Sequence, residues 1–293
     1  ESRAILDRLG VPTAPGTDTA WTFEPPPRER AERLLERAGW DGAQPIVAVC
    51  PIHPFWWPVK PEPLKAAVHG ITGGWADAHY KSVYFHKHGP DVDRALDQYL
   101  RGMAGALKDF LRARPGWFPI LVGMEQLDRG AVERLDEELG GAIPRFVSDE
   151  VEMYEMVALL RRCSLVVSSR YHALVCSMPG LVPSVGVTMD ERIRNLMADR
   201  GQPELALEVD DEHLDEHLLA AMLRATDEAD AVKDGIGRAV VSNLERMGAM
   251  GQVLERHVRG FHPDFPFPAR PDDPFAYLPP LGPTTAPLVA RYR

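Results

Sequence analysis

Cysteine is scarce in this chain of 293 residues, which contains only three. Cys50, Cys163 and Cys176 lie far apart inside apolar stretches, and no C-x-x-C pair occurs. A disulfide framework is thereby excluded, and we expect the three side chains to be reduced core residues. Reduced core cysteines are typical of cytoplasmic proteins, so the expected location is the cytoplasm.

Long apolar runs and positive charge are lacking too. No run approaches the ~18 apolar residues of a membrane-spanning helix, and no charged stretch followed by an apolar one opens the chain. We therefore expect no membrane span. The 33 lysines and arginines are outnumbered by 43 aspartates and glutamates, which gives a net charge of -10. Because clustered cations hold a phosphate backbone, nucleic acid is excluded as a partner, and an anionic ligand requires a local basic site.

Three catalytic or nucleotide-binding motifs are missing as well. No G-x-G-x-x-G follows a predicted strand, and neither G-x-x-x-x-G-K-[ST] nor G-x-S-x-G occurs. Their absence disfavours a dinucleotide-binding enzyme, a P-loop NTPase and an α/β-hydrolase. The overall composition, with 45% hydrophobic and 26% charged residues, is that of a globular protein.

What the sequence does contain is an alternation of apolar runs of strand length with segments of helical periodicity. The predicted strands are residues 20–23, 45–52, 118–123, 146–147, 165–167, 184–187 and 205–209. The predicted helices are residues 3–9, 28–38, 91–114, 129–139, 149–162, 191–200, 211–226 and 229–259. We expect Ser148 or Asp149 to cap the helix at 149–162. This spacing predicts an α/β fold, with a Rossmann-like parallel sheet and helices on both of its faces.

Proline-rich segments predict the boundaries of the domain. Residues 1–27 end in Pro-Pro-Pro and are interpreted as a preceding segment and linker. Residues 28–262 are the predicted Rossmann-like domain, with an irregular, tryptophan-rich insertion at 53–90. Residues 263–293 are a proline-rich, aperiodic tail, either disordered or laid across the surface as a strap.

Polar residues follow two of the predicted strands at their carboxyl ends, where parallel sheets bind ligands. The strand at 165–167 is followed by S-S-R-Y-H (168–172), and the strand at 184–187 by T-M-D-E-R (188–192). Both segments lead into helices, whose free N-terminal N–H groups favour anions. We therefore expect an anion-binding crevice at these two strand ends.

Five side chains in these segments are candidate site residues. Arg170 supplies a fixed cation, His172 a titratable group and Arg192 a second cation. Ser169 and Asp190 accompany them as candidate substrate-binding groups. The alternative interpretation is that Arg170 forms a surface salt bridge and His172 is a core histidine at a helix start.

Other histidines are weaker candidates. His53 follows the strand at 45–52, in H-P-F-W-W-P, and either faces substrate or belongs to an aromatic insertion that packs on itself. His86 and His88 have the spacing of metal ligands on a strand but lack a clear third ligand, so we expect no metal. His213 and His217 lie among acidic residues and are interpreted as surface residues.

The segment from Asp149 to Gly201 resembles the polysaccharide pyruvyl transferase family. Members of this family carry an R-x-H-A motif after an apolar strand, then a G-x-P element, then D-x-[KR] before a helix. The matching elements here are R-Y-H-A (170–173), G-L-V-P (180–183), which is one residue longer than in the family, and D-E-R (190–192). S-R-A-I-L-D-R-L-G-V (2–11) and D-T-A-W (18–21) resemble segments nearer the N-terminus of the family.

The resemblance implies a GT-B-like enzyme with two Rossmann-like domains, of which residues 1–27 would be the end of the first, with the rest of that domain missing. It implies transfer of pyruvate from phosphoenolpyruvate onto two hydroxyls of a sugar, forming a ketal. Arg170 would hold the phosphate or carboxylate of the donor, and His172 would act as general acid or stabilise the developing charge. The implied partners are phosphoenolpyruvate and a sugar acceptor, including lipid-linked glycans at a membrane surface, without a cofactor. A nucleotide-sugar glycosyltransferase and a non-catalytic relative are the alternatives.

Overall fold

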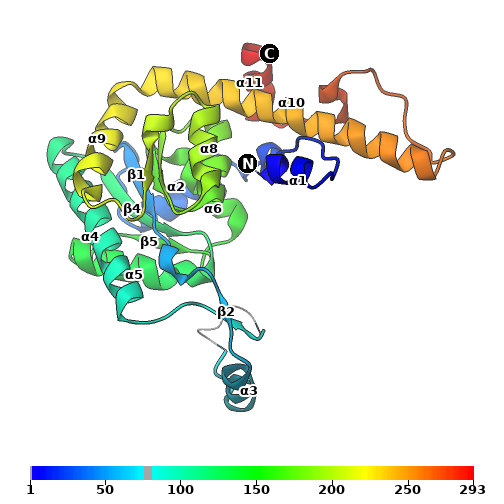
Figure 1. Cartoon of the computed structure of the whole chain (residues 1–293). Coiled ribbons are helices and arrows are strands. Elements are labelled where there is room, and N and C mark those ends of the chain that lie inside the picture. Colours follow the sequence, from blue (N-terminus) through cyan, green and yellow to red (C-terminus); the bar gives the residue numbers. More distant parts are fainter. Residues whose placement is uncertain (1, 76–80) are drawn as a thin grey trace.

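The computed structural model describes residues 2–75 and 81–293, and its centre is a sheet of six parallel strands (Figure 1). The strands are β1 (Ile46–Cys50), β4 (Phe118–Gly123), β5 (Arg145–Val147), β6 (Leu165–Ser168), β7 (Ser184–Thr188) and β8 (Ala206–Glu208). They lie in the order β5-β4-β1-β6-β7-β8. This is the doubly wound order of a Rossmann-like sheet, and the predicted α/β fold is confirmed.

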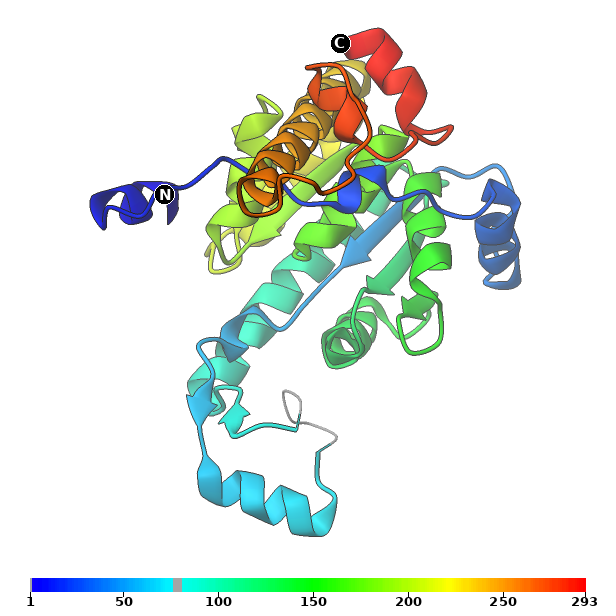
Figure 2. The ribbon, with the colours of Figure 1, turned by 90° about the vertical axis from the view of Figure 1, so that its right-hand side faces the viewer.

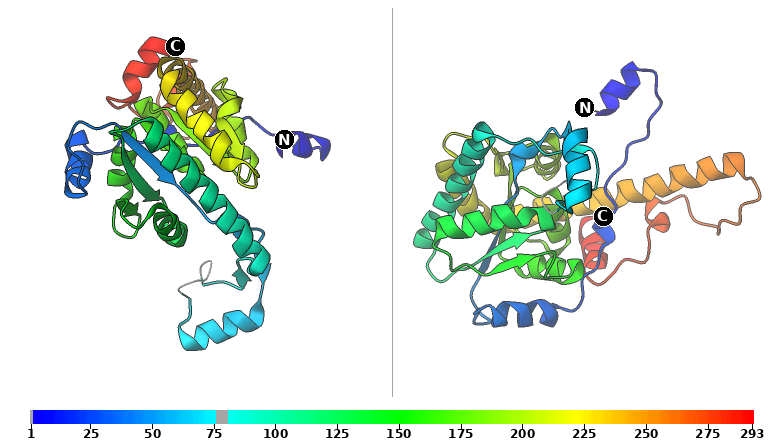
Figure 3. Two further views of the ribbon diagram at one scale, coloured as in Figure 1. Left: turned by 90° about the vertical axis from the view of Figure 1, so that its left-hand side faces the viewer. Right: turned by 90° about the horizontal axis from the view of Figure 1, so that it is seen from below.

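Helices cover both faces of the sheet (Figure 3). One layer consists of α4 (Pro90–Ala113), α5 (Arg129–Leu139) and α9 (Leu214–Asp227); the other consists of α2 (Arg28–Arg37), α6 (Met153–Arg162), α7 (Tyr171–Ser177) and α8 (Glu191–Asp199). Right-handed crossovers explain the division, because the chain leaves β1 in one direction and returns past it, from β5 to β6, in the other. No helix in residues 2–75 and 81–293 is both long enough and apolar enough to cross a membrane.

The central strands are buried on both faces. Every residue of β1, β6 and β7 is buried, which is why these strands appear in the sequence as continuous apolar runs. Gly186, in the middle of β7, lets α8 approach the sheet: a Cβ there would lie 2.2 Å from the Cγ2 atom of Ile193. A side chain at this position would push α8 away from the core.

Residues 20–23 do not form the predicted strand; Ala20–Thr22 form a 3-10 helix, η1. The amide of Ala20 donates to Asp18 Oδ1 at 2.8 Å. The indole of the buried Trp21 donates to Thr17 Oγ1 at 2.9 Å. Such local side-chain bonds compete with an extended conformation, and here they stabilise a turn instead.

Helix α6 begins at Met153, later than predicted, because residues 147–151 form a turn after β5. The amide of Val151 donates to the carbonyl of Val147 at 3.0 Å. The predicted cap is also wrong: Glu152 occupies the cap position without a side-chain hydrogen bond, and Asp149 pairs with Arg129 at 2.5 Å instead.

The insertion forms an arm that protrudes from the body of the domain (Figures 1 and 2). It contains η2 (Pro54–Trp56), β2 (Lys60–Pro61), α3 (Pro63–Thr72) and β3 (Tyr84–Phe85). The two strands pair in antiparallel fashion. The arm springs from the carboxyl end of β1, so its base adjoins the edge at which parallel sheets bind ligands.

The proline-rich tail contacts the helix that precedes it. Helix α10 (Ala229–Phe261) extends past the sheet (Figure 1). The chain then returns along α10 through η6 (Pro274–Tyr277) and α11 (Thr285–Tyr292). At the other end of the chain, α1 (Ser2–Arg8) lies away from the sheet (Figure 2). Glycines on α10 make room for the returning chain. A Cβ at Gly248 would lie 2.0 Å from the carbonyl oxygen of Pro274, and one at Gly237 would lie 2.3 Å from the ring of Tyr292.

Substituting Gly248→Ala is expected to detach η6 from α10, because the rigid backbone of Pro274 cannot yield to the new methyl group. Overpacking of this kind costs about 1–3 kcal/mol. Limited proteolysis should cleave residues 263–284 faster in the variant. Gly260→Ala is the matched control, since nothing lies within 4 Å of its Cβ position on the same helix. Equal cleavage rates in the two variants would contradict the close packing of Pro274 on Gly248.

Candidate functional site

The candidate site lies at the carboxyl edge of the sheet, where β1 and β6 are neighbours and the chain leaves them in opposite directions. Such a switch point opens a crevice in doubly wound folds. The loop after β6 is fixed to the last residue of β1, because the amide of Ser169 donates to the carbonyl of Cys50 at 3.1 Å. The Ser169 hydroxyl lies 2.7 Å from the hydroxyl of Tyr99. Ser169 is itself buried, so the candidate substrate-binding hydroxyl is engaged with α4.

Arg170 turns from β6 toward the loop after β4. Its Nε lies 2.9 Å from Asp128 Oδ2, its Nη2 also bonds Asp128 Oδ1, and the same Nη2 lies 3.1 Å from Glu125 Oε2. Asp128 is only 1% exposed. Burial raises the pKa of the Asp128 carboxyl, and the guanidinium of Arg170 offsets part of this rise. Arg170 therefore ties two strand ends together, with 27% of its side chain left exposed.

His172 turns the other way, toward the N-terminal segment. Its Nε2 lies 3.2 Å from Asp18 Oδ2, and 53% of its side chain is exposed. His172 is thus an accessible residue and not a core histidine. Asp18 also accepts a hydrogen bond from the amide of Ala20. The turn at η1 therefore holds the carboxylate in place beside the imidazole.

Arg192 belongs to the same side of the crevice as His172. Its guanidinium lies 5.8 Å from the ring centre of Tyr171, and that ring lies 5.5 Å from the ring of His172. Arg192 Nη2 lies 2.7 Å from Asp190 Oδ2, and 58% of the arginine side chain is exposed. The structure therefore brings Arg192, Asp190 and His172 together around Tyr171.

The backbone donors expected at the two loops are partly occupied by side chains. Asp190 Oδ1 accepts the amide of Arg192 at 2.9 Å and so caps α8. Ser168 Oγ accepts the amide of Arg170 at the same distance, 2.9 Å. An anion at these helix starts would depend on side-chain cations more than the sequence suggests, because local oxygen atoms already satisfy these amides.

His53 lines a cavity of about 920 Å³ beside this crevice, together with residues that follow β4 and β5. Its ring stacks on Trp56 at 4.3 Å, and Trp56 stacks in turn on His86 at 4.4 Å. Burial lowers the pKa of His53 to about 4, so its ring is neutral near pH 7. The aromatic cluster packs on itself and, with Trp75, also forms part of the cavity wall. A substrate-facing role of His53 stays a prediction.

The other histidine pairs considered in the sequence are His86 with His88 and His213 with His217. His88 lines the same cavity as His53. Among the side chains of the described residues, no group of three or more histidines, cysteines and acids could hold a metal ion. His217 is 56% exposed on α9, and its Nδ1 lies 2.8 Å from Asp211 Oδ2.

Two groups of side chains therefore occupy the carboxyl edge, one around Arg170 and the other around His172. Sequence reasoning missed the acidic partner of each. Asp128 follows a predicted strand, but nothing in its local pattern announced a buried ion pair. Asp18 lies within a segment that carries the family resemblance, and this was the signal available to find it.

Comparison with known proteins gives a likeness of backbone architecture. No family model matches the chain. One similar solved structure is a chain assigned as a UDP-N-acetylglucosamine 2-epimerase from Listeria monocytogenes, with 13% sequence identity and a TM-score of 0.44 over 82% of this chain and 50% of that one. Another is the N-terminal domain of trehalose-6-phosphate phosphatase from Candida albicans, with 13% identity and a TM-score of 0.44 over 78% of this chain and 45% of that one. The chain spans about half the length of each of these two chains.

Proposed function

We propose that this chain is the donor-binding part of a GT-B-like transferase that moves pyruvate from phosphoenolpyruvate onto a sugar or polysaccharide precursor in the cytoplasm. The observation that carries the proposal is the pairing of His172 with Asp18 beside the exposed cation of Arg192. An oriented imidazole next to an arginine combines a proton-transfer group with a site for a small anion.

The donor suits these residues because it is small and carries both a phosphate and a carboxylate. Arg192 is the better-placed arginine, since 58% of its side chain is exposed. Its partner Asp190 is also partly exposed and competes with an incoming anion. Arg170 is held by Asp128 and Glu125. Its proposed role is therefore to fix the position of the loop and to contribute to the electrostatic potential of the crevice.

His172 is the proposed proton donor and acceptor. The imidazolium gives its proton to the methylene carbon of phosphoenolpyruvate while a sugar hydroxyl oxygen bonds to the neighbouring enol carbon. The proton of that hydroxyl returns to His172. A second hydroxyl then displaces the phosphate, which leaves with the second hydroxyl proton, and the ketal is closed. Asp18 stabilises the charged imidazole and fixes its orientation.

The cavity lined by His53, Trp56 and Trp75 is the proposed acceptor site. Sugars present apolar faces that stack on indole rings. The cavity of about 920 Å³ lies within the usual range for small-molecule sites, roughly 300–1,000 Å³. The arm that carries Trp56 and Trp75 would therefore determine which acceptor is used.

A nucleotide-sugar glycosyltransferase is the second candidate function. It is favoured by the strand order, because the switch point between β1 and β6 is the place where doubly wound sheets bind nucleotides. The segments that follow these two strands lack a glycine-rich phosphate loop, which is why we place this candidate second.

Thermal unfolding with each donor separates the two functions. Phosphoenolpyruvate at about 100 times its dissociation constant should raise the melting temperature by several degrees. Arg192→Gln should abolish the rise. Arg194→Gln is the matched control, because Arg194 lies on the same helix and pairs with Glu208. Stabilisation by a nucleotide-sugar alone would favour the second candidate, and no response to either donor would indicate a non-catalytic relative.

A further inference from the structure

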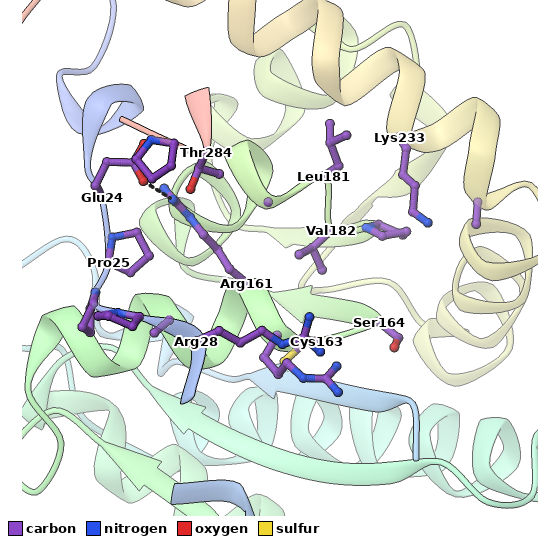
Figure 4. Close-up of a pocket in the computed structure, with 18 of the residues that line it drawn as sticks. Glu24, Pro25, Arg28, Arg161, Cys163, Ser164, Leu181, Val182, Lys233 and Thr284 are labelled. Carbon is purple, nitrogen blue, oxygen red and sulfur yellow. Dashed lines mark ion pairs between the residues drawn. The ribbon is translucent and has the colours of Figure 1, made fainter. Parts of the chain in front are cut away.

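A second cavity, of about 870 Å³, lies at the opposite edge of the sheet, where the strands begin. Its walls include residues that come just before strands: Trp117 before β4, Ser164 before β6 and Pro183 before β7. The proline linker at 25–27 and residues 283–284 of the returning tail complete the walls (Figure 4). This amino-edge cavity is thus separated from the candidate active site by the length of the sheet.

The lining of the amino-edge cavity is cationic. Its charged residues are Arg28, Arg161, Arg162, Lys233 and a single carboxylate, Glu24. Arg28 and Arg162 share one further acid, Glu32, at 2.7 and 3.1 Å. Lys233 has no ion-pair partner within residues 2–75 and 81–293. A surplus of positive charge in a chain of net charge -10 marks this cavity as a place for an anion.

Arg161 is buried in the wall with incomplete pairing. Its side chain is 7% exposed; its Nε donates to the carbonyl of Cys176 at 2.8 Å and its Nη2 to that of Phe23 at 2.7 Å. Its buried Nη1 has no hydrogen-bond acceptor among the described residues, and Glu24 Oε2 is 3.6 Å away. Burial lowers the pKa of Arg161. An anion in the cavity would stabilise this desolvated cation.

We propose that the amino-edge cavity binds a phosphate monoester on a planar body, the chemistry of a nucleoside monophosphate. A phosphate monoester carries nearly two negative charges, which matches the cationic surplus. Lys233 on α10 and the arginines of α2 and α6 approach the space from different walls (Figure 4). The planar body lies against the apolar part of the lining, which includes Trp117 and the prolines of the linker.

Isothermal titration with adenosine and uridine monophosphates tests this assignment. We expect binding by the wild-type protein and about tenfold weaker binding by Lys233→Gln, because one charge-assisted contact is lost. Arg256→Gln, an exposed position on the same helix outside the cavity, should bind like the wild type. Adenosine without its phosphate should bind at least tenfold more weakly, and inorganic phosphate should also bind more weakly than either nucleotide.

The site is identified by a second variant and a second readout. Arg192→Gln, at the carboxyl edge, should leave nucleotide binding unchanged, so failure of this proposal is distinguishable from failure of the proposed pyruvyl transfer. Hydrogen exchange in α11 should slow when the nucleotide binds, because residues 283–284 form part of the wall. Absence of binding at millimolar nucleotide, unchanged affinity in Lys233→Gln, or loss of affinity only in Arg192→Gln would each overturn the proposal.

Discussion

Replacing Arg170 by alanine is expected to reduce the free energy of unfolding by about 3–5 kcal/mol, because it leaves the carboxylate of Asp128 buried without its partner. Asp128 is 1% exposed and accepts hydrogen bonds from two nitrogen atoms of Arg170. Urea denaturation measures the loss. Arg129→Ala is the control: this arginine pairs with Asp149 and Glu150 near the same loop, in more exposed ion pairs worth less than about 1 kcal/mol.

Two further measurements separate the loss of the ion pair from the loss of packing. The double variant Asp128→Ala/Arg170→Ala should be more stable than Arg170→Ala, since no charge is left buried. The deficit of Arg170→Ala should also shrink as the pH falls toward about 4. An acid whose pKa is higher in the folded than in the unfolded state binds its proton more tightly when folded, so acid stabilises the fold. A deficit independent of pH, or equal to that of Arg129→Ala, would contradict the buried ion pair.

Substitution of His172→Gln should lower the rate of phosphate release from phosphoenolpyruvate, measured with a panel of sugar acceptors, by about 10²–10⁴-fold. Glutamine retains hydrogen-bonding ability but cannot exchange the proton that the proposed reaction requires. The KM for phosphoenolpyruvate should change little, because Arg192 supplies the anion contact. Asp18→Asn should have a smaller effect, about tenfold, since it alters only the orientation and charge of the imidazole.

His217→Gln is the matched control for this experiment. His217 is also an exposed histidine paired with an aspartate, but it lies on α9 among acidic residues. Its substitution should leave phosphate release unchanged. Full activity in His172→Gln would show that the imidazole takes no part in proton transfer, and equal losses in both variants would point to a general effect of histidine removal.

The sheet was predictable because its central strands are buried on both faces. The runs that became β1, β6 and β7 have few polar side chains, and little except a covered strand accommodates such runs at that length. Residues 20–23 show the limit of this reasoning. An apolar stretch of similar length forms a 3-10 helix there, because the side chains of Thr17 and Asp18 accept hydrogen bonds from Trp21 and Ala20. Whether such bonds form depends on the conformation of the chain, which the sequence pattern does not reveal.

The position of the candidate site in the fold could be predicted, but the directions in which its side chains point could not. A strand followed by S-S-R-Y-H put Arg170 and His172 at the carboxyl edge, as the structure shows. Which way each side chain turns depends on acids that are distant in the sequence, Asp128 for the arginine and Asp18 for the histidine. Local sequence patterns carry no information about such partners. The packing of the tail on Gly248 could not be predicted either, because it too joins residues that are distant in the sequence.

The two outermost strands of the sheet have a bearing on how the protein behaves at high concentration. β5 and β8 are only three residues long, and each carries an exposed charged residue, Arg145 in one and Glu208 in the other. A long, flat, uncharged border would offer its free amides and carbonyls to the sheet of another molecule, which is how aggregation by strand addition begins. Short edge strands that carry a charge give a second molecule little to pair with. The apolar sheet at the centre of this domain is therefore protected at both edges against intermolecular strand pairing.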